Sequence, residues 1–163
     1  MSTQIRALLA QIDEAYDHQS WHGTNLKGSL RGVTPRQAVW RSGPRRHNIW
    51  KIATHAAYWK YVAWRRLTAA KRGSFALSGS DWFPSPTSTR APDWRGSKAL
   101  LDAEHARLRA ALARLSGSQV SRRPVGSQLT WAALIRGIAA HDLYHAFQIQ
   151  LLKRLQRGRK RAG

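Results

Sequence analysis

Hydrophobic residues recur every three to four positions in four long segments, which is the spacing of one face of an α-helix. The four segments cover about residues 3–20, 48–70, 97–115 and 130–155. No stretch shows the sustained alternation of apolar and polar residues that is typical of a half-buried strand. The pattern therefore predicts an all-α fold with four long helices.

Start signals and a composition change refine this prediction. Asn48 and Thr130 are expected to cap the second and fourth long helices. Thr34 followed by Pro35 predicts a short extra helix that runs to about residue 40. Residues 73–94 are rich in Ser, Gly and Pro and contain large aromatic residues, among them Trp82, Phe83 and Trp94, so we expect a long ordered loop between the second and third long helices.

The length of the chain fits one domain with a real core. We expect a four-helix bundle over residues 1–156, either up-and-down or with longer crossovers, and a basic C-terminal tail over 157–163. The chain has no cysteine, which excludes disulfides, thiolate ligands and a cysteine nucleophile. A thiol could take part in chemistry here only if a small molecule supplied it.

The charge is unusually positive, with 28 Lys and Arg against 8 Asp and Glu. Six basic residues and no acidic ones lie between Lys27 and Arg46, and six more lie between Lys153 and Arg161. Non-specific binding to nucleic acid is one interpretation. A solvated basic surface with a frayed terminus is the simpler one, because most of the eight tryptophans occupy expected core or loop-anchor positions.

No apolar run approaches the roughly 20 residues of a membrane span, and the first residues do not resemble a secretory signal. We therefore expect a cytoplasmic protein with no membrane partner.

Two histidines interrupt the apolar stripe of the fourth helix. His141 and His145 are four residues apart, so they project from the same face, between Ile138 and Ile149. Two neighbouring imidazoles in a core are costly unless each finds a polar partner, and one shared divalent metal ion would serve both. His55 has an equivalent inward position on the second helix; taken alone, it would be interpreted as a hydrogen-bonded core residue.

The segment from His141 to His145 is similar to the His-Glu-x-x-His metalloprotease motif, but an aspartate replaces the glutamate. We reject that function because the aspartate is too short to act as the general base and no His, Asp or Glu follows His145. A third ligand must therefore come from upstream. Four other histidines are expected on loops, at the surface or in a groove: His18, His22, His47 and His105.

Three stretches together resemble the DinB/YfiT-like family of four-helix-bundle metalloproteins. They are residues 49–59, with His55 in the middle, residues 141–149, with both helix-four histidines, and residues 34–38. The resemblance covers about residues 5–156. It implies that His55, His141 and His145 bind a divalent metal ion (Zn, Ni, Fe or Mn). Bundles of this family often pair, so the resemblance also implies a homodimer.

The resemblance implies a metal-dependent enzyme that acts on a small-molecule substrate, either a transferase using a low-molecular-weight thiol or a hydrolase. Asp142, Tyr144 and Gln148 are candidate groups around the ligands, although Asp142 could instead face solvent. The family usually has glycine where this chain has Phe147, which we expect to narrow the space beside the site. Two alternatives stay open: a basic nucleic-acid-binding protein, and a bundle whose metal is purely structural.

Overall fold

A computed structural model of the chain describes every residue except 88, 125–126 and 162–163. For residues 159–161 it describes the backbone but not the side chains. Within the described residues the chain forms six helices and no strand, which confirms the predicted all-α class. The four long helices are α1 (Thr3–Tyr16), α4 (Ile49–Thr68), α5 (Ala91–Ala113) and α6 (Trp131–Arg161). The two short ones are α2 (Leu26–Ser29) and α3 (Pro35–Val39).

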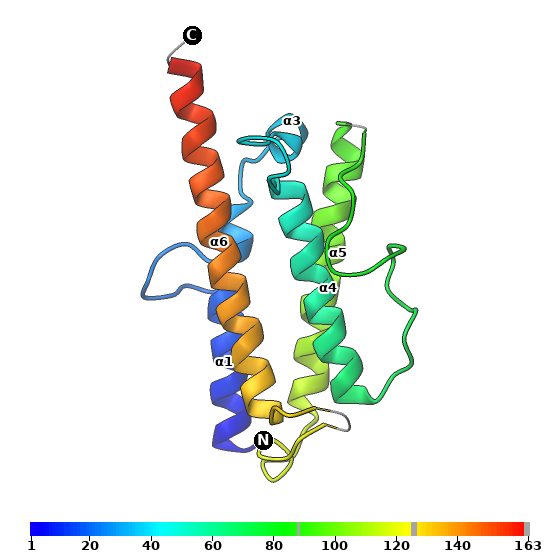
Figure 1. Cartoon of the computed structure of the whole chain (residues 1–163). Coiled ribbons are helices and arrows are strands. Elements are labelled where there is room, and N and C mark those ends of the chain that lie inside the picture. The colour runs from blue at the N-terminus through cyan, green and yellow to red at the C-terminus, as the bar shows by residue number, and fades with distance from the viewer. Residues whose placement is uncertain (88, 125–126, 162–163) are drawn as a thin grey trace.

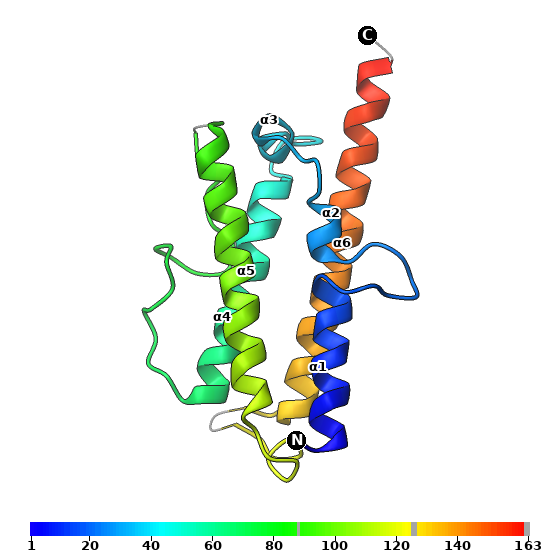
Figure 2. The same ribbon diagram turned by 180° about the vertical axis from the view of Figure 1, so that it is seen from behind.

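The long helices run side by side in two parallel pairs. In Figure 1, α1 and α6 rise from the end where the chain begins, whereas α4 and α5 run in the opposite direction. Helix α1 packs against α5 and α6, and α4 packs against the same two helices. Because α4 and α5 are parallel, the segment 69–90 must return along the full length of α4 to start α5 (Figures 1 and 2).

The helix starts follow the expected capping chemistry. Asn48 Oδ1 accepts from the backbone N–H of Lys51 at 2.9 Å, and Thr130 Oγ1 accepts from the N–H of Ala133 at 3.2 Å. Thr34 and Gln37 form a reciprocal capping box at the start of α3. The three predicted caps are therefore confirmed.

Several predicted boundaries are wrong. Helix α1 ends at Tyr16 rather than near residue 20, and the short α2 that follows was not predicted. Helix α5 begins at Ala91 rather than Ser97, because Pro92 sits in its first turn, where a missing N–H costs nothing. Helix α6 continues to Arg161 rather than ending near residue 155.

The C-terminal part of α6 extends beyond the other helices (Figure 1) and is held by polar contacts. Lys153 Nζ donates to the carbonyls of Ser29 and Arg31 at 2.9 and 3.1 Å. Gln156 Nε2 donates to the carbonyl of Gln37 at 3.0 Å. Lys153 is therefore engaged with the segment after α2 rather than freely solvated. No described helix is long and apolar enough to cross a membrane.

The apolar core consists of two clusters along the length of the helices. One cluster lies toward the ends near α2 and α3 and includes Trp50 and Ile149. The other lies near the start of α1 and includes Ile12 and Ile135. Buried polar residues fall between these clusters on all four long helices: Asp13, His55, Lys60, His105, Asp142 and His145. A polar band therefore divides the core in the middle of the molecule.

Candidate metal centre

Three imidazoles meet in this band, one from α4 and two from α6. The Nε2 atom of His141 lies 3.0 Å from Nε2 of His55 and 3.0 Å from Nε2 of His145. The side chains of His55 and His145 are buried, and His141 is partly exposed. The structure thus brings together the three residues that the resemblance singles out; we call them the histidine cluster.

The hydrogen bonds of the cluster determine which nitrogens carry protons. Nδ1 of His55 donates to the backbone carbonyl of Asp81 at 3.0 Å, and Nδ1 of His145 donates to Gln148 Oε1 at 2.7 Å. In a neutral imidazole with its proton on Nδ1, the Nε2 atom presents a lone pair. Two lone pairs therefore point at the Nε2 atom of His141.

No placement of protons on the three rings gives every ring nitrogen a hydrogen-bond partner. A single proton on His141 Nε2 would have to be shared between two acceptors, and Nδ1 of His141 is buried without a hydrogen-bond partner among the described residues. One cation among the three Nε2 atoms would satisfy all three lone pairs at once. Two nitrogens bound at 2.0–2.1 Å to a tetrahedral zinc ion lie about 3.3 Å apart, close to the 3.0 Å separations here. The residues therefore fit a divalent metal ion.

Burial keeps the imidazoles neutral at physiological pH. Desolvation lowers the pKa of His141 to about 3 and that of His145 to about 4, and it also lowers the pKa of His55. The charges of neighbouring imidazoles add to the effect at His141. Since only the neutral form can donate a lone pair, the three side chains are ready to act as ligands without losing a proton.

Residues from the segment between α4 and α5 complete the surroundings. The indole of Trp82 stacks on His55 with ring centroids 3.7 Å apart, and His47 stacks on Trp82 at 3.6 Å. The carboxylate of Asp81 lies 3.2 Å from His55 Nδ1 and accepts from Trp59 Nε1 at 2.9 Å. Sequence reasoning expected a long ordered loop here but missed Asp81. Its signal was weak: it is the one acidic residue of that segment.

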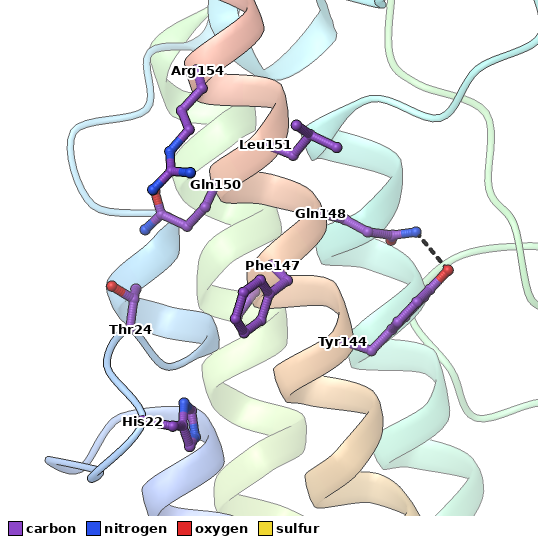
Figure 3. A pocket seen from close by; sticks show the side chains of 9 residues that line it. His22, Thr24, Tyr144, Phe147, Gln148, Gln150, Leu151 and Arg154 are labelled. Atoms are coloured by element: carbon purple, nitrogen blue, oxygen red, sulfur yellow. Dashed lines mark hydrogen bonds between the residues drawn. The ribbon is translucent and has the colours of Figure 1, made fainter.

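The three residues proposed to surround the ligands differ in their positions. Gln148 contacts His145 directly, as described above. Tyr144 is 62 % exposed; its ring meets that of His145 edge-on at a centroid distance of 5.2 Å, and its hydroxyl accepts from Gln148 Nε2 at 2.9 Å (Figure 3). The alternative that Asp142 faces solvent is wrong, because its side chain is fully buried.

Asp142 belongs to a second polar group in the same band, with one member from each long helix. Lys60 on α4 forms a fully buried ion pair with Asp142 on α6. Lys60 Nζ also lies 3.5 Å from Nδ1 of His105 on α5, and Nε2 of that ring lies 3.4 Å from Asp13 on α1. We call Asp13, Lys60, His105 and Asp142 the charged layer. Sequence reasoning missed it because a lysine inside a helix is normally exposed.

The remaining histidines are outside the cluster. His18, His22 and His47 are exposed, in agreement with the loop and surface assignment. The expectation that His105 is solvated or faces a groove is wrong, because its ring is buried and stacks on Tyr16 at a centroid distance of 4.0 Å.

Phe147 does not narrow the space around the cluster, which corrects the expectation drawn from the missing glycine. Its ring is 68 % exposed on the outer face of α6, directed toward His22 and Thr24 (Figure 3). There it lines a groove of about 530 Å³ together with Leu151 and Arg154. The two-residue offset from His145 places it on the opposite side of the helix.

The fold and the site together define an all-helical protein with three convergent imidazoles at its centre, two of them buried and one partly exposed. The family model of the DinB superfamily matches residues 18–149, so the chain belongs to the DinB superfamily. No curated protein matches the chain, and no solved structure does.

Proposed function

We propose that this chain is a DinB-type four-helix-bundle metalloprotein in which His55, His141 and His145 hold one divalent metal ion. The observation that carries the proposal is the pair of 3.0 Å separations from His141 Nε2 to the Nε2 atoms of His55 and His145, which the outer hydrogen bonds leave as lone pairs. Imidazole ligands suit zinc, nickel and iron, and manganese is also a candidate, so the donor set does not select one of them.

The proposed activity is that of a metal-dependent enzyme, either a transferase that uses a low-molecular-weight thiol or a hydrolase. A divalent ion at this position would lower the pKa of a thiol or of water and so supply a nucleophile near neutral pH. Three protein ligands would leave a coordination position open for such a group. The complete lack of cysteine fits a thiol that arrives on a small molecule.

The surrounding residues of the chain would prepare the site. Gln148 and the Asp81 carbonyl hold His145 and His55 in the tautomer that directs Nε2 inward. Trp82 covers one face of His55 and keeps water from it. The exposed hydroxyl of Tyr144, held by Gln148, is placed to contact a substrate that approaches along α6.

Metal content tests the proposal directly. We expect about one divalent ion per chain in tag-free protein by elemental mass spectrometry, and none in His145→Ala. His22→Ala is the matched control, because His22 is exposed and outside the cluster. Loss of metal in both variants, or no metal in the wild type after reconstitution, would contradict the proposal.

The catalytic part is tested separately by mixing metal-loaded protein with thiols and electrophiles and following the free thiol. Turnover in the wild type but not in His145→Ala would support a transferase. A fully loaded protein that turns over neither thiol nor hydrolysable substrates would indicate a structural metal.

A further inference from the structure

A second cavity lies on the far side of Trp59 from the histidine cluster, between the C-terminal half of α4 and the segment that follows it. It has a volume of about 500 Å³. Its lining includes Arg65, Arg66 and Arg72 from the end of α4 and the segment after it, together with residues 73 and 75–80. The proposed metal chemistry does not use this cavity.

The three arginines have no carboxylate partner among the described residues. Residues 18–80 contain no Asp or Glu at all, so no acid lies near them in the sequence. Seven of the eight carboxylates are paired elsewhere: Asp13, Asp17, Asp81, Asp93, Asp102, Glu104 and Asp142. The eighth, Glu14, is exposed on α1. The positive charge of the three arginines is therefore left for a group from outside the chain.

The cavity also offers aromatic surface beside this charge. Tyr58, Tyr61 and Phe75 line it, and the ring of Phe75 lies 5.4 Å from that of Tyr58 and 5.3 Å from that of Tyr61. These rings pack against one another and onto Phe83, so the wall is preformed rather than loose. Most sites for small organic molecules combine such apolar walls with a few polar groups.

One hydrogen-bond donor is available between the rings and the arginines. The hydroxyl of Tyr61 accepts from the backbone N–H and the hydroxyl of Ser74, at 3.3 and 3.4 Å. Its own proton has no acceptor in these contacts and is free to be donated. The contacts with Ser74 and the charge of Arg65 lower the pKa of Tyr61, which makes the phenol a stronger donor.

We infer that this cavity binds a small organic anion in which a phosphate or carboxylate group is attached to a planar apolar ring system. The guanidinium groups match the anionic end by charge and by paired N–H donors. The rings of Tyr58, Tyr61 and Phe75 match the planar end by stacking or edge contacts. The site requires no metal ion, so it does not depend on the function proposed above.

The alternative to a specific binding site is non-specific electrostatic attraction, because a chain of net charge +20 attracts anions over its whole surface. Titration calorimetry in EDTA with four probes separates these cases: 1-naphthyl phosphate, 1-naphthoate, 1-naphthol and inorganic phosphate. We expect 1-naphthyl phosphate or 1-naphthoate to bind at least ten-fold more tightly than 1-naphthol, which lacks the anionic group, and than inorganic phosphate, which lacks the ring. The stronger of the two identifies the anionic group.

Matched charge changes provide the decisive control. Arg65→Gln with Arg72→Gln is expected to weaken binding of the stronger probe at least ten-fold. Arg36→Gln with Arg123→Gln removes the same charge from exposed sites outside the cavity and should weaken it less than two-fold. Tyr61→Phe, which keeps the ring and removes the donor, is expected to cost three- to ten-fold.

Three results would overturn the inference: equal losses in the two arginine pairs, equal affinity for inorganic phosphate and 1-naphthyl phosphate, or no binding of either naphthyl anion to the wild type. Far-ultraviolet circular dichroism on each variant shows whether it is folded before its affinity is compared.

Discussion

The histidine cluster and the charged layer are neighbours in one polar band, yet their buried polar atoms are paired in different ways. The charged layer pairs a buried ammonium with a buried carboxylate, and its histidine sits between a lysine and an aspartate. The histidine cluster has hydrogen bonds only on its outer side, while the inner nitrogens face one another. The layer pairs its opposite charges internally, whereas the inner nitrogens of the cluster have only one another as partners among the described residues.

The comparison teaches that buried polarity alone does not indicate a ligand site. Both groups include residues of α4 and α6, and both have strongly shifted pKa values at a histidine. What distinguishes them is how their charges and lone pairs are paired. The layer pairs Lys60 with Asp142 and leaves Oδ1 of that carboxylate without a partner among the described residues, whereas in the cluster the Nε2 atoms face one another. Opposite charges paired within a group are typical of a structural role, and several lone pairs facing one point are typical of a place for a cation.

Breaking the charged layer should give the largest effect on stability. Lys60→Met leaves Asp142 buried and unpaired, which we expect to lower the free energy of unfolding by about 3–5 kcal/mol. Asp142→Leu leaves the ammonium unpaired and should cost a similar amount. The double variant should be less destabilised than either single one, because no uncompensated charge remains. Urea unfolding at pH 7 in EDTA measures all three without a contribution from metal.

Lys51→Met is the control for this series, because Lys51 lies on the same helix without a carboxylate partner among the described contacts. It should change the free energy of unfolding by less than about 0.5 kcal/mol. Strictly additive losses of unfolding free energy in the double variant would contradict the view that Lys60 and Asp142 stabilise the fold as a pair.

Sequence reasoning recovered one of the two regions. The spacing of His141 and His145 within an apolar stripe was visible because histidine at two successive core positions is unusual. Lys60 and Asp142 could not be paired from sequence, because 82 positions separate them and each type is ordinarily exposed. Only packing of α4 against α6 shows that they meet.

The same contrast holds for the fold. Caps at Thr34, Asn48 and Thr130 were predictable because a side chain bonds a backbone group three residues away. The extension of α6 beyond residue 155 was not, and the contacts of Lys153 and Gln156 with carbonyls more than 100 residues away could not be seen in the sequence either. Local chemistry indicated where α3, α4 and α6 begin, whereas the start of α5, which has no side-chain cap, was misplaced.

Removing an outer hydrogen bond should weaken the cluster without unfolding the protein. Gln148→Leu deletes the acceptor for His145 Nδ1 and frees the ring to rotate or change tautomer. Such outer partners are typically worth 10- to 100-fold in metal affinity, and we expect a loss in that range. Competition with a chromophoric chelator measures it. The exposed Tyr144→Phe, which removes only the next contact outward, should change affinity less than three-fold.

The pH dependence of stability provides a finer test of the charged layer. Burial, with Lys60 and Arg109 nearby, lowers the pKa of His105 to about 2. Above the unfolded value of about 6.5 both states are neutral. As pH falls below it, only the unfolded state gains a proton, so stability declines by up to about 1.4 kcal/mol per pH unit for this one group.

His105→Gln removes this contribution. The loss of unfolding free energy between pH 6 and pH 4 should therefore be smaller in the variant, by up to about 1.4 kcal/mol per pH unit. Urea midpoints at pH 7, 6, 5 and 4 in EDTA give the slopes, whatever the stability of the variant at pH 7. The exposed His22→Gln should leave the slope of the wild type unchanged. Identical slopes for wild type and His105→Gln would mean that the ring takes up a proton in the folded state.

The smallest effect is expected at Asp81, where the cluster has two acceptors for one N–H. The backbone carbonyl of Asp81 accepts from His55 Nδ1 at 3.0 Å, and its carboxylate lies 3.2 Å from the same atom. Asp81 has a positive φ of 60°, a conformation that asparagine tolerates equally well. Asp81→Asn should therefore keep the backbone and the tautomer while removing one half-exposed charge. We expect metal affinity to fall two- to five-fold by chelator competition, less than for Gln148→Leu; a larger loss than at Gln148 would show that the carboxylate, not the carbonyl, holds His55.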